Sequence, residues 1–184
     1  MLNNIEEMKE SGELEEMPNG EELLDKRRYM KRLATALTPL VKYYATETCN
    51  EVCYDSMQVL AGSGYMQDYE VERLYRDARI TTIYEGTTQI QYGAAVSYIT
   101  RGFFEDRFDE LHERYADAPS EMLNSLVEAR EKLSETIEFV NEQDDQFRDL
   151  NAGRLCESVV TIYNGYLLLG PAQRSDHKMA LAKN

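Results

Sequence analysis

Hydrophobic positions recur every three or four residues along most of this chain, which is the period of an amphipathic helix. A first helix is predicted from Asn19, which has Glu22 three residues later, as in a helix start. Its apolar series is Leu23, Leu24, Arg27, Met30, Leu33 and Leu37. Thr38-Pro39 predicts a new helix, because proline suits the first helical position and threonine can cap it. That second helix ends at Gly62 and carries along one side Val41, Ala45, Thr48, Val52, Ser56, Val59 and Leu60.

Shorter helices are predicted between Gly62 and the middle of the chain. One has on one face Val71, Leu74, Tyr75 and Ala78. The next opens at Thr87 or Thr88, where Thr88 and Gln91 have the spacing of a capping box, and it continues through Ile90, Ala94 and Ile99 toward Gly102. A further helical series is Phe104, Phe108, Leu111 and Tyr115. Between two of these helices, residues 80–84 have the composition of a strand. A lone strand has no partner, so we expect an extended link between helices.

The last third of the chain reads as an antiparallel pair of helices. Ala118-Pro119-Ser120 indicates a boundary, and Asn141 to Asp145 would make the turn. The first helix has a near-heptad stripe formed by Leu123, Leu126, Arg130, Leu133, Ile137 and Val140. The second has an answering face formed by Ala152, Leu155, Val159, Ile162, Tyr163, Tyr166 and Leu169, and Gly170-Pro171 closes it. The predicted fold class is all-α, a helical bundle followed by a helical hairpin.

Composition narrows the classes of protein that remain. Of 184 residues, 34 are acidic and 20 basic, a net charge of −14, which argues against a nucleic-acid binder that needs a basic face. No apolar run has membrane-spanning length, and no secretory signal is visible. The three cysteines suit a reducing compartment, so we expect a cytoplasmic protein. Cys49 and Cys53 lie one helical turn apart, but nothing nearby completes a metal site. His112 and His177 are isolated, and we interpret both as surface residues.

Glu85 is the one carboxylate placed in an unusual junction, directly before Gly86 and two threonines. From the residues alone it has three interpretations: a solvated acid, a helix-capping acid or a catalytic base. Exposed glutamate is the usual state. The pattern by itself therefore does not decide among the three.

The stretch from Asp55 to Gln91 closely resembles the C-terminal helical domain of the acyl-CoA dehydrogenases. The matching elements follow in order without a gap: Gln58-Val59-Leu60-Ala61-Gly62, Gly64-Tyr65, Val71-Glu72, Tyr75-Arg76-Asp77-Ala78-Arg79 and Ile83-Tyr84-Glu85-Gly86-Thr87. Residues 38–42 and the helical tail after Pro119 look like the extended members with an additional C-terminal α-helical domain. The acidic N-terminal segment (1–20) is expected either to fray or to form part of a helix whose partner is missing. The expected organisation continues with a partial bundle of the family's C-terminal helical domain (21–118) and an additional helical domain (119–184).

The resemblance also implies roles for single residues. Glu85 stands where many of these enzymes place the base that removes the α-proton of the acyl-CoA thioester, before a β-hydride passes to flavin and leaves trans-2-enoyl-CoA. Tyr84 and Gly86 resemble positions that line the thioester site. Residues in FAD-contacting positions are Thr87, Thr88 and Gln89, at a helix N-terminus that suits an anionic cofactor. Gln58, Val59, Leu60, Ala61 and Gly62 resemble the segment that reaches the FAD of a neighbouring subunit, which implies a homo-oligomer, a dimer or a tetramer.

Partners follow from the same resemblance: an acyl-CoA substrate of fatty acid β-oxidation and an electron-transferring flavoprotein as acceptor. We expect Arg76, Asp77 and Arg79 to form a structural ion-pair network. Ala61 stands where the family often has glycine, and Glu70 where proline is common. The family's N-terminal and central domains have no counterpart here.

We therefore expect the C-terminal part of an enzyme, inactive alone and with weak or absent FAD. Two alternatives are a non-catalytic helical interaction module derived from this family and a flavin oxidase on the same scaffold.

Overall fold

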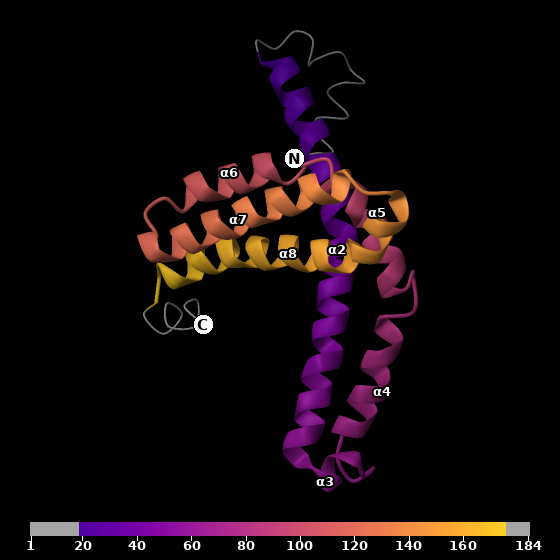
Figure 1. Ribbon diagram of the computed structural model, residues 1–184. Coiled ribbons are helices and arrows are strands. Elements are labelled where there is room, and N and C mark those ends of the chain that lie inside the picture. Colours follow the sequence, from indigo (N-terminus) through magenta and orange to yellow (C-terminus); the bar gives the residue numbers. More distant parts are fainter. Residues whose placement is uncertain (1–18, 176–184) are drawn as a thin grey trace. The chain divides into compact units, whose positions relative to one another are not determined.

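The computed structural model describes residues 19–175 (Figure 1). Its helices are α2 (Gly20–Leu60), α3 (Gly62–Tyr65), α4 (Val71–Thr81), α5 (Thr88–Ile99), α6 (Glu105–Arg114), α7 (Ser120–Asn141) and α8 (Asp145–Ala172). No strand occurs in this part of the chain, so the predicted all-α class is confirmed. None of the described helices is long and apolar enough to cross a membrane. The N-terminal segment 1–18 and His177 lie outside the described residues.

Helix α2 begins at Gly20, next to the predicted start, but it does not stop at Pro39. The predicted new helix at Thr38-Pro39 is therefore wrong. Proline removes one backbone donor, which the carbonyl of Thr35 would have accepted. Thr35 is exposed, so water can satisfy that carbonyl. The hydroxyl of Thr38 also donates to the Ala34 carbonyl at 2.7 Å, within the same turn.

The chain divides into two compact units between Thr38 and Pro39, and the second extends from Pro39 to the end. The division into domains at 118/119, which we expected from Ala118-Pro119-Ser120, stays a prediction. Within the second unit, α4 lies alongside the later part of α2 (Figure 1). Asn50 of α2 donates to the carbonyl of Ala78 in α4 at 3.0 Å.

The apolar side predicted for the second half of α2 is largely exposed. Val41, Val52 and Val59 are 61%, 57% and 84% exposed. The face that packs is instead mixed: the ring centroid of Tyr43 lies 4.8 Å from that of Tyr92 in α5. On α4 only Ala78 of the predicted face is buried, while Leu74 and Tyr75 remain exposed. Helical periodicity located these helices, but it did not identify their covered faces.

Helices α5 to α8 enclose the main core. Its largest fully buried side chains are Tyr166, Phe108, Ile99, Leu111, Leu155 and Leu169. Two glycines of α8 allow close helix approach. A Cβ at Gly165 would lie 2.6 Å from Leu126 Cδ2 of α7, and one at Gly153 would lie 3.0 Å from the Tyr92 ring of α5. The antiparallel pair α7–α8 and its stripes are confirmed, although α8 continues through Pro171 to Ala172.

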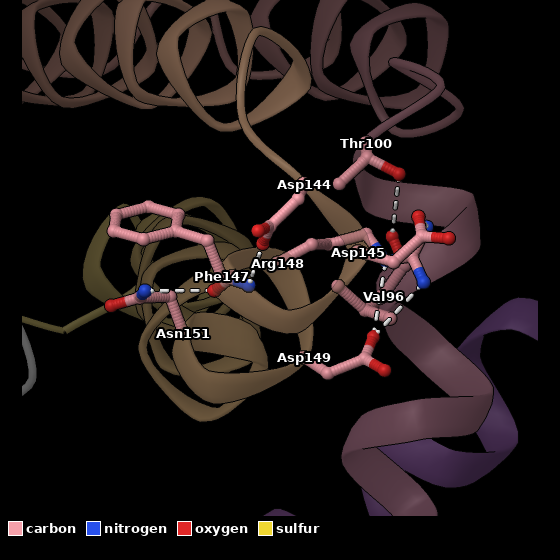
Figure 2. A network of polar contacts seen from close by, with 8 residues as sticks. All are labelled: Val96, Thr100, Asp144, Asp145, Phe147, Arg148, Asp149 and Asn151. Atoms are coloured by element: carbon pink, nitrogen blue, oxygen red, sulfur yellow. Dashed lines mark hydrogen bonds and ion pairs between the residues drawn. The ribbon is translucent and has the colours of Figure 1, made fainter.

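The start of α8 is fixed by local polar contacts (Figure 2). Asp144 caps the helix, because its carboxylate accepts a hydrogen bond from the Phe147 N–H at 2.8 Å. Arg148 lies between Asp145 and Asp149, with N–O distances of 2.8 and 3.0 Å. The predicted turn after Asn141 is thereby confirmed.

A polar cluster joins the three helices of the C-terminal half. Arg130 of α7 pairs with Asp109 at 2.6 Å and with Glu105 at 3.3 Å, both on α6. Burial alone would lower the pKa of Arg130, but hydrogen bonds with Asp109, Tyr166 and Glu105 raise it overall. His112 Nδ1 lies 3.3 Å from the Tyr166 hydroxyl. His112 is thus half-buried in the cluster, and its interpretation as a surface residue is wrong.

Candidate active site

The junction between α4 and α5 is a compact turn and not the extended link that we predicted. Residues 80 and 81 complete α4, and the N–H groups of Ile83 and Tyr84 both donate to the Ile80 carbonyl, at 3.0 and 3.1 Å. Thr82 is only 3% exposed, and its carbonyl accepts from the Thr88 N–H at 3.2 Å. Tertiary context has overridden the strand propensity of this run.

Glu85 has a backbone conformation that non-glycine residues seldom adopt. Its φ is 53°, and the following Gly86 has a φ of 96°. A left-handed conformation costs an L-residue about 1–2 kcal/mol. Gly86 is needed for space as well, since a Cβ there would lie 2.8 Å from Gln91 Nε2. Strain of this kind persists only where surrounding contacts impose it, and it tends to cluster at functional sites.

Two side chains hold the three successive carbonyls of residues 84–86, and we call this arrangement the carbonyl clamp. Lys42 Nζ of α2 donates to the carbonyls of Tyr84 and Gly86, at 2.8 and 2.5 Å. Gln91 Nε2 of α5 donates to the carbonyls of Glu85 and Gly86, at 3.2 and 3.3 Å. Hydrogen bonds from a charged donor are worth about 1.5–3 kcal/mol each. The bonds from Lys42 are therefore large enough to offset the strain at Glu85.

The side chain of Glu85 takes no part in the clamp. It is exposed, and within the described residues its carboxylate forms no hydrogen bond or ion pair. Glu85 does not cap a helix either, because the residue before α5 is Thr87 and the residue after α4 is Thr82. The interpretation of Glu85 as a helix-capping acid is thereby excluded. The turn is fixed while the carboxylate is left available.

The predicted capping box at the start of α5 is also absent. Thr87 occupies the N-cap position and makes no side-chain cap hydrogen bond. Gln91 is used by the carbonyl clamp instead. The hydroxyl of Thr88 donates to the carboxylate of Glu47 on α2, which ties the first turn of α5 to the same helix that carries Lys42.

The predicted site residues fall into two groups. Tyr84, Glu85 and Gly86 lie directly before the first turn of α5, which contains Thr87, Thr88 and Gln89 at its start. Tyr84 is half exposed, and its ring centroid lies 5.5 Å from Lys42 Nζ. Residues 58–62 lie at the other end of α4, a helix of 11 residues that spans about 16 Å at 1.5 Å per residue. The chain does not bring the two groups together.

The segment 58–62 has its own strained residue. Helix α2 ends at Leu60, and the backbone turns at Ala61, with φ 50° and ψ −137°, and not at Gly62 as we predicted. Gly62 begins α3. The residue that departs from the family pattern is therefore the one whose backbone most favours glycine. Beside this segment a groove of about 670 Å³ is lined by Met57, Tyr65, Met66, Gln67, Asp68, Glu72, Tyr75 and Arg76.

The ion-pair network expected on α4 is different from the prediction. Arg76 pairs with Glu72 at 2.5 Å, and Arg79 donates to the Thr82 hydroxyl of the turn. Within the described residues Asp77 forms no ion pair with either arginine. Arg79 thus helps to anchor the turn, whereas Arg76 stabilises only its own helix.

Sequence reasoning gave no role to Lys42 or Glu47 and gave Gln91 only a place in a capping box, although all three contact this junction. A signal was present in α2. Polar residues at Lys42, Thr46 and Asn50 recur every fourth position, and all three are half-buried. Such a stripe on one face of a helix indicates polar contacts with a neighbouring segment.

The geometry thus defines an all-α domain with a free carboxylate on a fixed turn at a helix N-terminus. Residues 22–97 match the family model of the acyl-CoA dehydrogenase C-terminal domain. Relatives include the caffeyl-CoA reductase-Etf complex subunit CarC of Acetobacterium woodii, 51% identical over 61 residues, 33% of this chain and 16% of the relative. An acyl-CoA dehydrogenase of Bacillus subtilis is 43% identical over 63 residues, 34% of this chain and 17% of the relative.

A third relative is the mitochondrial long-chain specific acyl-CoA dehydrogenase of Sus scrofa, 47% identical over 60 residues, 33% of this chain and 14% of the relative. The chain therefore spans less than a fifth of the length of these relatives. The similarity to the acyl-CoA dehydrogenase C-terminal domain thus lies within residues 22–97.

Proposed function

We propose that this chain supplies the C-terminal domain of an FAD-dependent acyl-CoA dehydrogenase, with Glu85 as the base that removes the α-proton. One observation carries the proposal: the carboxylate of Glu85, unpaired among the described residues, stands on a strained turn that other side chains hold in place. A merely solvated glutamate needs no such support. Relatives named as acyl-CoA dehydrogenases add the reaction class.

The chemistry that the turn suits is proton transfer at a carbon next to a thioester. A general base must come within hydrogen-bonding reach of the proton it removes. Gly86 has no side chain beside the carboxylate, so a substrate can approach the backbone closely. Tyr84 would line the thioester site from the other side of Glu85. FAD, when bound, supplies the acceptor for the β-hydride, while the α-proton stays on the Glu85 carboxylate.

The same group can serve both directions of the reaction. A carboxylate that removes the α-proton from an acyl-CoA is, once protonated, the acid that returns it to an enoyl-CoA. The names of the relatives include both reduction and oxidation: one is a caffeyl-CoA reductase subunit, and another is a cyclohexane-1-carbonyl-CoA dehydrogenase. We propose oxidation of acyl-CoA to trans-2-enoyl-CoA as the physiological direction, within fatty acid β-oxidation.

FAD and protein partners would use different parts of the domain. The first turn of α5, with Thr87 to Gln89, offers backbone N–H groups to an anionic cofactor. Residues 58–62 are separated from Glu85 by the length of α4. We therefore propose that they contact the FAD of a neighbouring subunit, in a dimer or tetramer, and not the FAD beside Glu85. One relative is named as part of a reductase–Etf complex, and we propose an electron-transferring flavoprotein as the acceptor here.

The test places this chain's residues in a complete enzyme. Residues 39–97 would replace the corresponding segment of the Bacillus subtilis acyl-CoA dehydrogenase, and bleaching of the flavin by an acyl-CoA substrate of the parent would be followed anaerobically. We expect the chimera to be reduced, and Glu85→Gln to slow reduction by about two to four decades without weakening substrate binding. Glu51→Gln, which changes an exposed carboxylate of α2, is the matched control and should leave the rate unchanged.

Two results would count against this function. If Glu85→Gln retains more than a tenth of the chimera's rate with unchanged substrate binding, Glu85 is not the base. If the chimera folds and binds flavin but is not reduced, the domain more closely fits a non-catalytic interaction module.

A further inference from the structure

Lys42 makes an unusual use of a half-buried ammonium group. Its Nζ donates to two main-chain carbonyls 42 and 44 residues away, and within the described residues it pairs with no carboxylate. Burying part of a cation without an acidic partner is costly, so its contacts need to compensate. Both acceptors belong to the residues that flank Glu85, namely Tyr84 and Gly86.

The contacts of Lys42 constrain the backbone on both sides of Glu85. The carbonyls of Tyr84 and Gly86 converge on one Nζ only while the intervening residue turns the chain, and Glu85 does so with a φ of 53°. The bonds from Gln91 to the same segment are longer, at 3.2 and 3.3 Å, and come from a neutral amide. Lys42 is therefore the stronger member of the carbonyl clamp.

The contacts that hold the turn both come from α2. Lys42 lies in the middle of α2. The hydroxyl of Thr88 contacts Glu47, which lies five residues further along the same helix. The turn is thus held against α2 at its beginning and at its end. Between these two anchors the Glu85 carboxylate bonds to no residue that the structure describes.

We propose that Lys42 is a positioning residue for the Glu85 carboxylate: by holding the peptides on either side, it keeps the backbone of Glu85 left-handed. This inference rests on the proposed function of Glu85. Lys42 itself neither touches substrate nor exchanges a proton in this role. It acts only through the backbone of residues 84–86.

The first test uses the full 184-residue chain. Nuclear magnetic resonance reports φ through the backbone shifts and the HN–Hα coupling of Glu85 and Gly86. We expect Lys42→Met, which keeps the length but removes the ammonium, to move both residues out of their left-handed conformation. Lys42→Arg keeps a cation with several donors and should restore the parent signals. Lys132→Met, which removes an exposed lysine of α7, is the control and should change neither residue.

Unchanged signals of Glu85 and Gly86 in Lys42→Met would overturn the proposal. If that variant does not fold, Lys42→Gln replaces it, because the amide keeps one neutral donor. For Lys42→Gln we expect a mixture of the left-handed and relaxed conformations, and a single parent-like conformation would overturn the proposal equally well.

The second test separates this inference from the function on which it rests. In the chimeric enzyme described above, Lys42→Met should slow flavin reduction at least tenfold with unchanged substrate affinity, and Lys42→Arg should recover most of the rate. If Glu85→Gln is harmless there, the proposed function fails, whatever Lys42 does. If Glu85→Gln abolishes reduction but Lys42→Met reduces flavin at the parent rate, only the positioning role is refuted.

Discussion

The helices α2 to α5 and the helices α6 to α8 use their apolar side chains differently. In residues 39–99, many large apolar side chains remain exposed, among them Val41, Val52, Val59, Tyr65, Met66, Leu74, Ile80, Ile83 and Ile90. In residues 105–172, the apolar stripes face one another and are covered, with exceptions at Phe139, Leu150, Leu167 and Leu168. An exposed apolar surface of this extent is typical of a region that contacts a ligand or another protein surface.

Backbone strain divides the two regions in the same way. Among the described residues, the non-glycine positions with positive φ are Ala61 and Glu85, and both belong to the first region. The match to the acyl-CoA dehydrogenase C-terminal domain also covers the first region and ends at residue 97. The exposed apolar side chains and the strained backbone of the first region both cost stability, which is expected of a region with a function. The second region lacks this strain among its described residues and mainly packs against itself.

The largest expected effect tests the packed region. Leu133 of α7 is 4% exposed, so Leu133→Asp buries an unpaired carboxylate. We expect it to lower the free energy of unfolding by about 3–5 kcal/mol, measured by urea denaturation. Leu150→Asp makes the same chemical change on α8 at a side chain that is 83% exposed, and it should have little effect. Equal stability of the Leu133→Asp variant and the parent would show that this stripe is not covered in solution.

A second experiment tests whether the Glu85 turn is held as tightly as its geometry indicates. Gly86→Ala places a Cβ 2.8 Å from Gln91 Nε2 in a residue with φ 96°. We expect a loss of about 1–3 kcal/mol in the free energy of unfolding. Gly93→Ala, in α5 and with no atom within 4 Å of the added Cβ, is the matched control. It should gain about 0.5–1 kcal/mol, because alanine favours the helix. A gain for both variants would mean that the turn is loose.

The contrast between the regions also explains what the sequence could predict. Periodicity predicted helices throughout, and in α7 and α8 it identified the buried faces as well, because these two stripes cover each other. In the second half of α2 and in α4, apart from Ala78, the same kind of stripe is largely exposed, so the prediction of which face packs was wrong there. Periodicity indicates that a face is apolar. Only the neighbouring element decides whether it is buried.

For the candidate site, the resemblance of the motif identified Glu85, and the structure added why the backbone there is unusual. Lys42 and Gln91 could not be assigned from propensity, since their partners are backbone carbonyls, which every residue carries. Pro39 shows that a strong local signal can also mislead. It is a strong local signal for a helix start, but an exposed carbonyl one turn earlier lets the helix continue.

Replacing the strained residues by glycine should stabilise the chain slightly and rank the two strained positions. Ala61→Gly should raise the free energy of unfolding by about 1–2 kcal/mol, since its φ of 50° with ψ −137° is a region that strongly favours glycine. Glu85→Gly should gain less, about 0.5 kcal/mol, because the carbonyl clamp already compensates for the strain and glycine costs backbone entropy. Thermal and urea denaturation measure both. A loss of stability in Glu85→Gly would give the side chain a structural role and weaken its assignment as a functional residue.

An effect of less than 1 kcal/mol at pH 9.5 concerns the alkaline stability of the packed region. Cys156 of α8 is fully buried, and burial raises the pKa of its thiol from 9.0 to about 12. Well below pH 9, as at pH 7, the thiol keeps its proton in both the folded and the unfolded state. Between about pH 9 and pH 12 the unfolded state loses it first, so rising pH destabilises the fold. At pH 9.5 this loss is about 0.8 kcal/mol relative to pH 7. Cys156→Ala should lower stability at pH 7 but remove that part of the alkaline loss. Urea denaturation between pH 7 and pH 10 with a reductant measures the difference. Parallel profiles for the Cys156→Ala variant and the parent would indicate that this thiol is open to water.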